Sequence, residues 1–192
     1  MDAAKIVSKI SKEHGIIKNV YFLACGGSLV DLYPGYYFVR AESAVMDAQW
    51  IPAREFALTP PKKLGKDSLL IICSHSGKTK ECLEAAKVGI NAGAAVVTMT
   101  HAPGSPCDCE EWISVVYDWA PGVKEAQKPQ GIVLGILNEL MKAQEPGYTL
   151  YSSIKEGFEK IDDIIAEAVK KQQNSVRIPK GQQHGLWGKF FA

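Results

Sequence analysis

The residues best suited to binding chemistry form one short turn, Ser74-His75-Ser76-Gly77-Lys78-Thr79. Serine and threonine hydroxyls donate hydrogen bonds, and a glycine lets the backbone come close to a ligand. A helix that follows such a turn adds unpaired N–H groups and the positive end of its dipole. We therefore expect the turn to bind a small anion, the phosphate of a phosphorylated sugar.

The same turn has two other interpretations. The letters Gly77-Lys78-Thr79 match the end of a nucleotide-binding P-loop, but that motif requires a glycine at position 72, which holds Ile72. A triphosphate site is therefore not expected. An ordinary helix start remains open, in which Ser76 or Thr79 caps the helix and nothing binds.

Apolar runs on both sides of the turn predict the elements that position it. The run Ser68–Cys73 can only be a buried strand, and residues 80–90 place apolar side chains at helical spacing. A second glycine-serine turn, Cys25-Gly26-Gly27-Ser28, follows a buried strand at residues 19–24. Both turns thus lie at the carboxyl end of a strand.

The segment after the second turn is less regular. We predict a helix from about residue 29 to residue 42, with Ser28 as its N-cap and Pro34 bending it or restricting its first turn. Residues 44–49 can form a short strand.

Short strands alternate with longer helices along the whole chain. The remaining elements are predicted as helices at 2–14, 129–143 and 151–173 and as strands at 94–100 and 112–117. This alternation is typical of an α/β fold with a parallel sheet covered on both faces. Such sheets bind ligands outside the carboxyl ends of their strands, where the strand order reverses. If the strands before the two turns are neighbours, both turns face one crevice.

Composition excludes several classes of function. Lys plus Arg number 22 and Asp plus Glu 21, and no Lys/Arg-rich run occurs, so neither nucleic acid nor a membrane surface is an expected partner. Cys107 and Cys109 form a C-x-C pair, which alone is a weak metal signal, and we expect no metal. No apolar run is long enough to span a membrane, and a reduced cytoplasmic protein is the default expectation.

Three segments together resemble the sugar isomerase (SIS) domain: Tyr21–Ser28, Ser74–Glu81 and a short β-strand region that ends at Arg54-Glu55-Phe56. Within that superfamily the chain is similar to the N-terminal half of the fructosamine-6-phosphate deglycases over about residues 1–173. The resemblance implies a flavodoxin-like three-layer sandwich with a five-stranded parallel sheet. It also implies an SIS domain at 1–150, a helical extension and tail at 151–192 that leads into a second SIS domain, and a homodimer.

The resemblance also implies roles for the two turns. Ser74, Ser76 and Thr79 would bind the substrate phosphate, with His75, Gly77 and Lys78 completing the turn, and Gly26, Gly27 and Ser28 would line the sugar. The reaction would release an amino acid from a sugar–amino acid adduct and leave glucose 6-phosphate. It would proceed by acid/base proton transfer at the sugar carbons, without a metal or other cofactor.

The sequence departs from the deglycases in its acid/base groups. In that family a Glu and a His belong to the second domain, within a Ser-Gly-Glu-Phe-x-His-Gly-Pro motif that this sequence does not contain. Candidates within the chain are Glu55, Glu125 and His75, and His101 ends a strand at the same edge of the sheet. Each is also consistent with a plain surface residue, as are Lys78 and Lys128 beside the expected phosphate.

Three functions therefore remain open. The first is a phosphosugar deglycase, of which this chain supplies the phosphosugar-binding half. The second is a single-domain sugar-phosphate isomerase. The third is a non-catalytic module that binds a sugar phosphate and reports it. Whether the chain is an enzyme by itself is left open by the missing motif.

Overall fold

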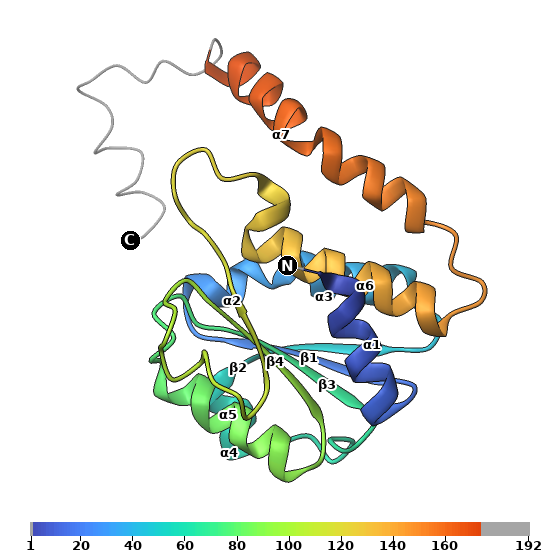
Figure 1. Cartoon of the computed structure of the whole chain (residues 1–192), viewed down its shortest axis with the longest axis vertical. Helices are drawn as coiled ribbons and strands as arrows, with labels where there is room; N and C mark the ends of the chain where they lie inside the picture. Colours follow the sequence, from blue (N-terminus) through green and yellow to red (C-terminus); the bar gives the residue numbers. More distant parts are fainter. Residues whose placement is uncertain (1, 174–192) are drawn as a thin grey trace, which may run out of the picture.

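Five parallel strands form one sheet at the centre of the structure, in the order β2-β1-β3-β4-β5 (Figure 1). The computed structural model describes residues 2–173. Within them the strands are β1 (Asn19–Ala24), β2 (Asp47–Pro52), β3 (Ser68–Cys73), β4 (Ala95–Thr100) and β5 (Ile113–Val116). Every neighbouring pair is parallel, so the carboxyl ends of all the strands lie at one edge of the sheet.

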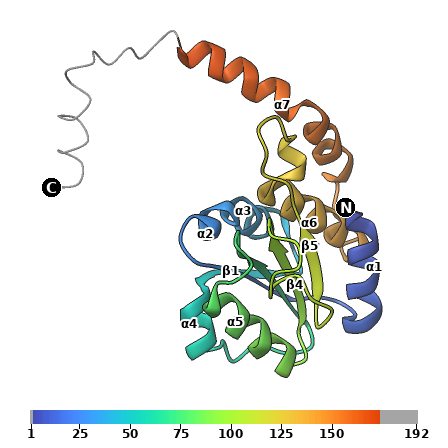
Figure 2. The ribbon, with the colours of Figure 1, turned by 60° about the vertical axis from the view of Figure 1, so that its left-hand side comes forward.

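Helices cover both faces of this sheet (Figure 1, Figure 2). One face carries α1 (Ala3–His14), α3 (Tyr33–Glu42) and α6 (Pro129–Gln144), and the other carries α4 (Ala53–Leu58) and α5 (Lys80–Asn91). The short α2 (Gly27–Asp31) follows β1, and a 3₁₀ turn, η1 (Glu125–Gln127), precedes α6. The predicted α/β class, a flavodoxin-like sandwich of three layers, is confirmed.

Alternate side chains of each central strand enter different layers. In β1, Val20 and Phe22 pack into the cluster beneath α1, α3 and α6, while Tyr21 and Leu23 pack into the cluster beneath α4 and α5. All residues of β1 and of β3 are buried. Because both faces are covered, these strands consist of unbroken apolar runs, which made them easy to predict.

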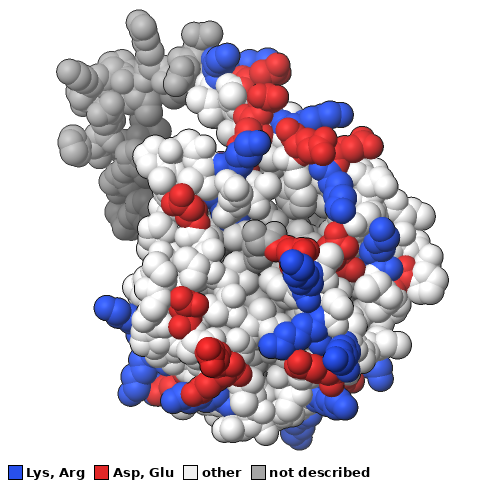
Figure 3. All heavy atoms as spheres, in the orientation of Figure 1, with Lys and Arg blue, Asp and Glu red and all other residues white. Residues whose placement is uncertain are grey.

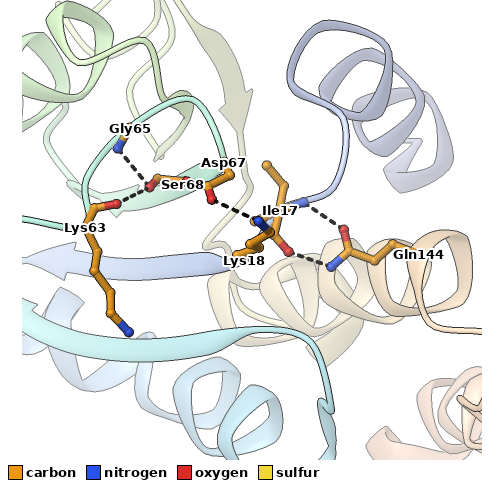
Figure 4. Close-up of polar contacts among 7 residues, drawn as sticks. All are labelled: Ile17, Lys18, Lys63, Gly65, Asp67, Ser68 and Gln144. Atoms are coloured by element: carbon orange, nitrogen blue, oxygen red, sulfur yellow. Dashed lines mark hydrogen bonds and ion pairs between the residues drawn. The ribbon is translucent and has the colours of Figure 1, made fainter.

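Polar contacts fasten the amino edge of the sheet (Figure 4). The Gln144 side-chain amide accepts from Ile17 N at 3.0 Å and donates to Ile17 O at 2.8 Å, which joins the end of α6 to the start of β1. Lys18 N donates to Asp67 O at 2.8 Å, and Ser68 Oγ accepts from Gly65 N at 3.1 Å. The starting points of β1 and β3 are therefore fixed relative to each other.

The single helix predicted at residues 29–42 is wrong, because the structure has two helices that meet at Leu32. Pro34 occupies the first turn of α3. A proline has no N–H and its ring clashes with the carbonyl four residues earlier, so the helix restarts there. The prediction of Ser28 as N-cap is also wrong, since Gly26 is the N-cap of α2 and Ser28 lies inside the helix.

The strand predicted at residues 44–49 is displaced to Asp47–Pro52, and the expected β-strand region at Arg54-Glu55-Phe56 is helical, within α4. Ser43 explains the first error, because its hydroxyl accepts from Met46 N at 2.8 Å and donates to the buried carboxylate of Glu145. That long-range contact holds the residues before β2 in a turn. The other predicted elements differ from the observed ones by at most one residue at either end.

The long helix α7 (Tyr151–Gln173) runs from α6 away from the sandwich (Figure 1). Its first turn is held by Tyr151, whose hydroxyl donates to Glu139 at 2.7 Å and whose ring lies under the Lys142 ammonium at 3.7 Å. Further along, Asp162 accepts from Glu125 N at 3.0 Å. Exposed apolar side chains follow at Ile164, Ile165 and Val169. The rest of the predicted extension, residues 174–192, lies outside the described residues.

The crossing of α3 over α6 generates a test of the packing. A Cβ at Gly35 would lie 2.3 Å from Val133 Cγ1, whereas a Cβ at Gly135 of α6 meets nothing within 4 Å. We expect Gly35→Ala to lower the free energy of unfolding by about 1–3 kcal/mol through overpacking. Gly135→Ala should raise it by about 0.5–1 kcal/mol through helix propensity. Urea unfolding of both variants measures this, and equal effects would contradict the described contact.

Candidate functional site

The strand order reverses between β1 and β3, which lie side by side at the centre of the sheet. Ala24, the last residue of β1, is paired in register with Cys73, the last residue of β3. The turns at 25–28 and 74–79 therefore begin next to each other at the carboxyl edge. The predicted adjacency of their strands is confirmed, and this edge is where open α/β sheets bind ligands.

Hydrogen bonds within the turn 74–79 give it a fixed shape. Ser74 is only 2% exposed, and its hydroxyl donates to Thr79 Oγ1 at 2.9 Å and accepts from Thr79 N at 3.4 Å. The Ser74 carbonyl accepts from Gly77 N at 2.9 Å. Ser76 and Lys78 are exposed and Thr79 is half-buried. Ser74 thus holds the turn together from within, while the other polar groups are accessible to a ligand.

The loop that follows β4 supports this turn from one side. His101 N donates to the carbonyl of His75 at 3.1 Å, and Cys107 N donates to the carbonyl of Gly77 at 3.0 Å. Gly77 has a φ of 64°, and a Cβ there would lie 1.9 Å from Ser105 Oγ. Only glycine satisfies both the left-handed backbone and this close approach.

The glycine-serine turn after β1 is open on its outer side. Gly26 and Gly27 are exposed, and a Cβ built at either meets nothing within 4 Å. Ser28 is half-buried and lies near the thiol of Cys73 at the end of β3, where its hydroxyl acts to lower the pKa of that thiol. Ser28 therefore lies close to the second turn, while the glycines leave space above it.

A polar cluster lies beside the two turns. Asp31 of α2 accepts from Gln130 Nε2 of α6 at 2.9 Å. Burial raises the pKa of Asp31, an effect that the nearby His75 opposes. Burial also raises the pKa of Tyr117 and brings that of the Cys73 thiol to about 12. Sequence reasoning missed Asp31, Gln130 and Tyr117, because they come from elements that only the strand order and helix packing bring together.

Two histidines and two aromatic rings form the rim next to this cluster. The rings of His75 and His101 are stacked, with centroids 4.9 Å apart and planes 14° from parallel. His75 Nδ1 lies 3.0 Å from the hydroxyl of Tyr117, and His101 Nδ1 lies 3.1 Å from its carbonyl oxygen. The Trp119 ring meets His75 edge-on at 5.7 Å. His75 is thus fixed in place although its ring is exposed.

Glu55 and Glu125, the acidic candidates for proton transfer, lie on elements that cover opposite faces of the sheet. Glu55 is exposed in α4. Glu125 is half-buried in η1, beside α6, and its carboxylate forms an ion pair with Lys128. Lys128 therefore neutralises Glu125 instead of pointing freely toward a phosphate.

Hollow space adjoins the same edge of the sheet. A cavity of about 400 Å³ beyond the end of β5 is lined by Val116, Tyr117, Asp118, Ala126, Gln127 and Ile132. A cavity of about 240 Å³ lies at the opposite edge, against α1. Neither cavity is lined by a residue of the two turns, but the larger one shares Tyr117 with the polar cluster beside them.

Metal-binding clusters and membrane-spanning helices were sought only among the described residues. Among residues 2–173 no group of three or more His, Cys, Asp or Glu side chains is placed to hold a metal ion. None of the described helices is both long and apolar enough to cross a membrane. Basic and acidic side chains are interspersed over the face seen in Figure 3.

Comparisons with known proteins agree with this geometry, although no protein-family model matches the chain. The chain is 31% identical to fructosamine deglycase FrlB of Bacillus subtilis over 161 residues, covering 84% of this chain and 49% of that protein. A Salmonella typhimurium structure classed as a phosphosugar isomerase superposes with a TM-score of 0.83 at 32% identity, over 90% of this chain and 52% of that one.

A Bacillus subtilis structure of the same class gives a TM-score of 0.80 at 30% identity, over 90% of this chain and 54% of that one. The chain therefore spans about half the length of these relatives.

The close approach at Gly77 can be tested by substitution. Gly77→Ala should lower the free energy of unfolding by about 2–5 kcal/mol, from left-handed strain plus overpacking against Ser105. Gly104→Ala is the matched control, because its φ is 71° but a Cβ there meets nothing within 4 Å. It should cost only about 1–2 kcal/mol. If urea unfolding gives the same loss of unfolding free energy for both variants, the close contact between position 77 and Ser105 is wrong.

Thiol reactivity tests the burial around the site. Burial raises the pKa of Cys73 to about 12 and of Cys107 to about 11, and raises that of Cys82 as well. We expect Ellman's reagent at pH 8 to modify the half-buried Cys25 and Cys109 first. The other thiols should react only on unfolding. Mass spectrometry of the modified peptides identifies which cysteines have reacted. Rapid modification of Cys73 would contradict the described packing.

Proposed function

Because the chain is homologous to fructosamine deglycase FrlB and to phosphosugar isomerases of the SIS fold, we propose that it is a phosphosugar-binding domain of the fructosamine-6-phosphate deglycase type. One observation carries the proposal. The register of Ala24 with Cys73 sets the two glycine- and hydroxyl-containing turns side by side at the point where the strand order reverses.

In this proposal the turn 74–79 binds the phosphate. Ser76 and Thr79 donate their hydroxyls, and the first N–H groups of α5 point toward the same place with the positive end of the helix dipole. Ser74 keeps the turn in shape through its bonds to Thr79. The exposed Lys78 adds a positive charge.

The sugar then extends toward the second turn. The exposed Gly26 and Gly27 leave room for its ring, and the half-buried Ser28 offers a hydroxyl. Asp31 and His75 lie beside this path, and a carboxyl and an imidazole are groups that can serve as general acids or bases; burial raises the pKa of Asp31. This arrangement supports binding of a phosphosugar adduct in an orientation that leaves its first carbons near the cluster.

Catalysis by the deglycase route requires a base within hydrogen-bond reach of a sugar C–H. Release of an amino acid with formation of glucose 6-phosphate is proposed for the longer proteins of this type, in which His75, Glu125 or Glu55 acts together with groups of a second domain. A non-catalytic sensor of sugar phosphates is the second candidate. The ion pair of Glu125 with Lys128 and the exposure of Glu55 favour that alternative.

We also propose the organisation around the domain. The SIS domain covers residues 1–150, and the extension from residue 151 leads toward a second SIS domain, in keeping with relatives about twice as long. The exposed apolar side chains of α7, including Ile164 and Val169, support contacts with a further domain or with a second subunit of a homodimer.

For the location of the protein we propose the cytoplasm, because its five cysteines are unpaired and that compartment keeps thiols reduced.

Binding is testable by thermal unfolding with glucose 6-phosphate or fructose 6-phosphate. A ligand at about 100 times its Kd stabilises by about 2.7 kcal/mol, which corresponds to a rise in Tm of roughly 5–10 °C for a domain of this size. The double variant Ser76→Ala, Thr79→Ala should weaken binding at least about tenfold, because two hydrogen bonds to a charged group are lost.

The matched control replaces two exposed hydroxyls away from the site, Ser152→Ala with Ser153→Ala, and should keep the full rise in Tm. If millimolar phosphosugar leaves the Tm of the unsubstituted protein unchanged, the binding proposal is wrong. An unaltered affinity in the Ser76, Thr79 variant would place the phosphate elsewhere. Incubation with fructose-asparagine 6-phosphate, followed by an assay for free asparagine, separates the deglycase from the sensor.

A further inference from the structure

Asp31 carries a carboxylate at the carboxyl edge of the sheet but belongs to neither of the two turns. It is the last residue of α2, the short helix that begins in the glycine-serine turn. Residues three and four apart lie on the same face of a helix, so Asp31 shares a face with Ser28 and Gly27. Side chains of a helix also lean toward its amino end, so the carboxylate is directed back toward the glycine-serine turn.

This face of α2 is turned toward the hydroxyl-rich turn. Ser28 and Asp31 both lie near the Cys73 thiol at the end of β3, and Asp31 also lies near His75, a residue of that turn. Val30, on another face of α2, is 63% exposed. Asp31 therefore reaches from the first turn toward the second, at the ends of β1 and β3 where the strand order reverses.

One oxygen of the Asp31 carboxylate is bound within the protein. Oδ1 accepts from Gln130 Nε2 at 2.9 Å. Gln130 keeps its N–H on Asp31 although its own Oε1 is buried without a hydrogen-bond partner among residues 2–173. Among the same residues only Gln130 donates to this carboxylate, which leaves Oδ2 for a ligand.

Partial burial favours a hydroxyl group as that ligand. Asp31 is half-buried, and burial raises its pKa because the charged form has lost part of its water. A hydroxyl that donates to Oδ2 replaces some of this water, and a hydrogen bond to a charged group is about twice as strong as a neutral one. A phosphate dianion, which has only acceptor oxygens, is repelled by the same carboxylate.

We propose that Asp31 selects a sugar in this site, by accepting hydrogen bonds through Oδ2 from hydroxyl groups of the phosphosugar. The exposed Gly26 and Gly27 leave space for the sugar beside it. The exposed Lys78 attracts the phosphate to the other turn while Asp31 repels it, so the two charges also set the direction in which the ligand lies. This role of Asp31 rests on the proposed function, because it needs the phosphate bound in the turn 74–79.

Two phosphate monoesters test the selection. Fructose 6-phosphate carries sugar hydroxyls and ethyl phosphate carries none, and both are dianions at about pH 7.5 because the second pKa of such esters is about 6. By phosphorus NMR titration, we expect the unsubstituted protein to bind fructose 6-phosphate at least about 10-fold more tightly.

Asp31→Asn keeps the shape of the side chain and an acceptor for Gln130 but removes the charge. It should weaken fructose 6-phosphate about 3- to 10-fold and leave ethyl phosphate equally or more tightly bound, because a repulsion is lost. The matched control is Asp67→Asn, which removes a half-buried carboxylate at the amino edge, paired there with Lys18, and should keep the full ratio.

Circular dichroism checks that each variant is folded. If Asp31→Asn does not fold, Gln130→Met takes its place, because it leaves the carboxylate but removes the N–H that holds it. This variant should lower the ratio of affinities about 2- to 5-fold, with the affinity for ethyl phosphate unchanged.

The outcomes separate this role from the proposed function. If the unsubstituted protein binds the two esters equally, Asp31 selects nothing and the phosphate site stands. If Asp31→Asn weakens both esters alike, or neither, the carboxylate does not bind the sugar and its assignment is wrong. If fructose 6-phosphate does not bind at millimolar concentration, the proposed function fails, and the role of Asp31 fails with it.

Discussion

The parallel pairing of β1 with β3 is the constraint on which the site depends. It sets Ala24 opposite Cys73, so the chain leaves the sheet twice at neighbouring points. One exit becomes a glycine-serine turn and the other a hydroxyl-rich turn. Contacts at the far edge, such as the Gln144 amide on Ile17, fix where β1 begins and therefore where it ends. A shift of one residue in this register would move one turn away from the other.

The hydroxyl-rich turn owes its shape to buried contacts around it. Ser74 holds it from within, and the loop after β4 holds it from the side through His101 and Cys107. Because these bonds within the protein define the backbone of the turn, they would preorganise it for the proposed anion. Ser105 lies so close to Gly77 that no side chain fits at this position, so the backbone of the turn has little room to move.

Local patterns predicted the sheet and the two turns, because a buried parallel strand and the Ser/Gly turn after it consist of residues that are consecutive in the sequence. Long-range contacts explain what was missed. Ser43 bonds a carboxylate 102 residues away and shifts the start of β2, which no local pattern reveals. Asp31 and Tyr117 reach the site only through strand order and helix packing. Pro34, in contrast, was a readable signal for the break between α2 and α3.

A crystal structure with bound glucose 6-phosphate tests the central claim most directly. The account predicts a phosphate within hydrogen-bond distance of Ser76 Oγ, Thr79 Oγ1 and the first N–H groups of α5, with the sugar directed toward Gly26 and Ser28. A phosphosugar found instead at the amino edge of the sheet, in the cavity against α1, would contradict it.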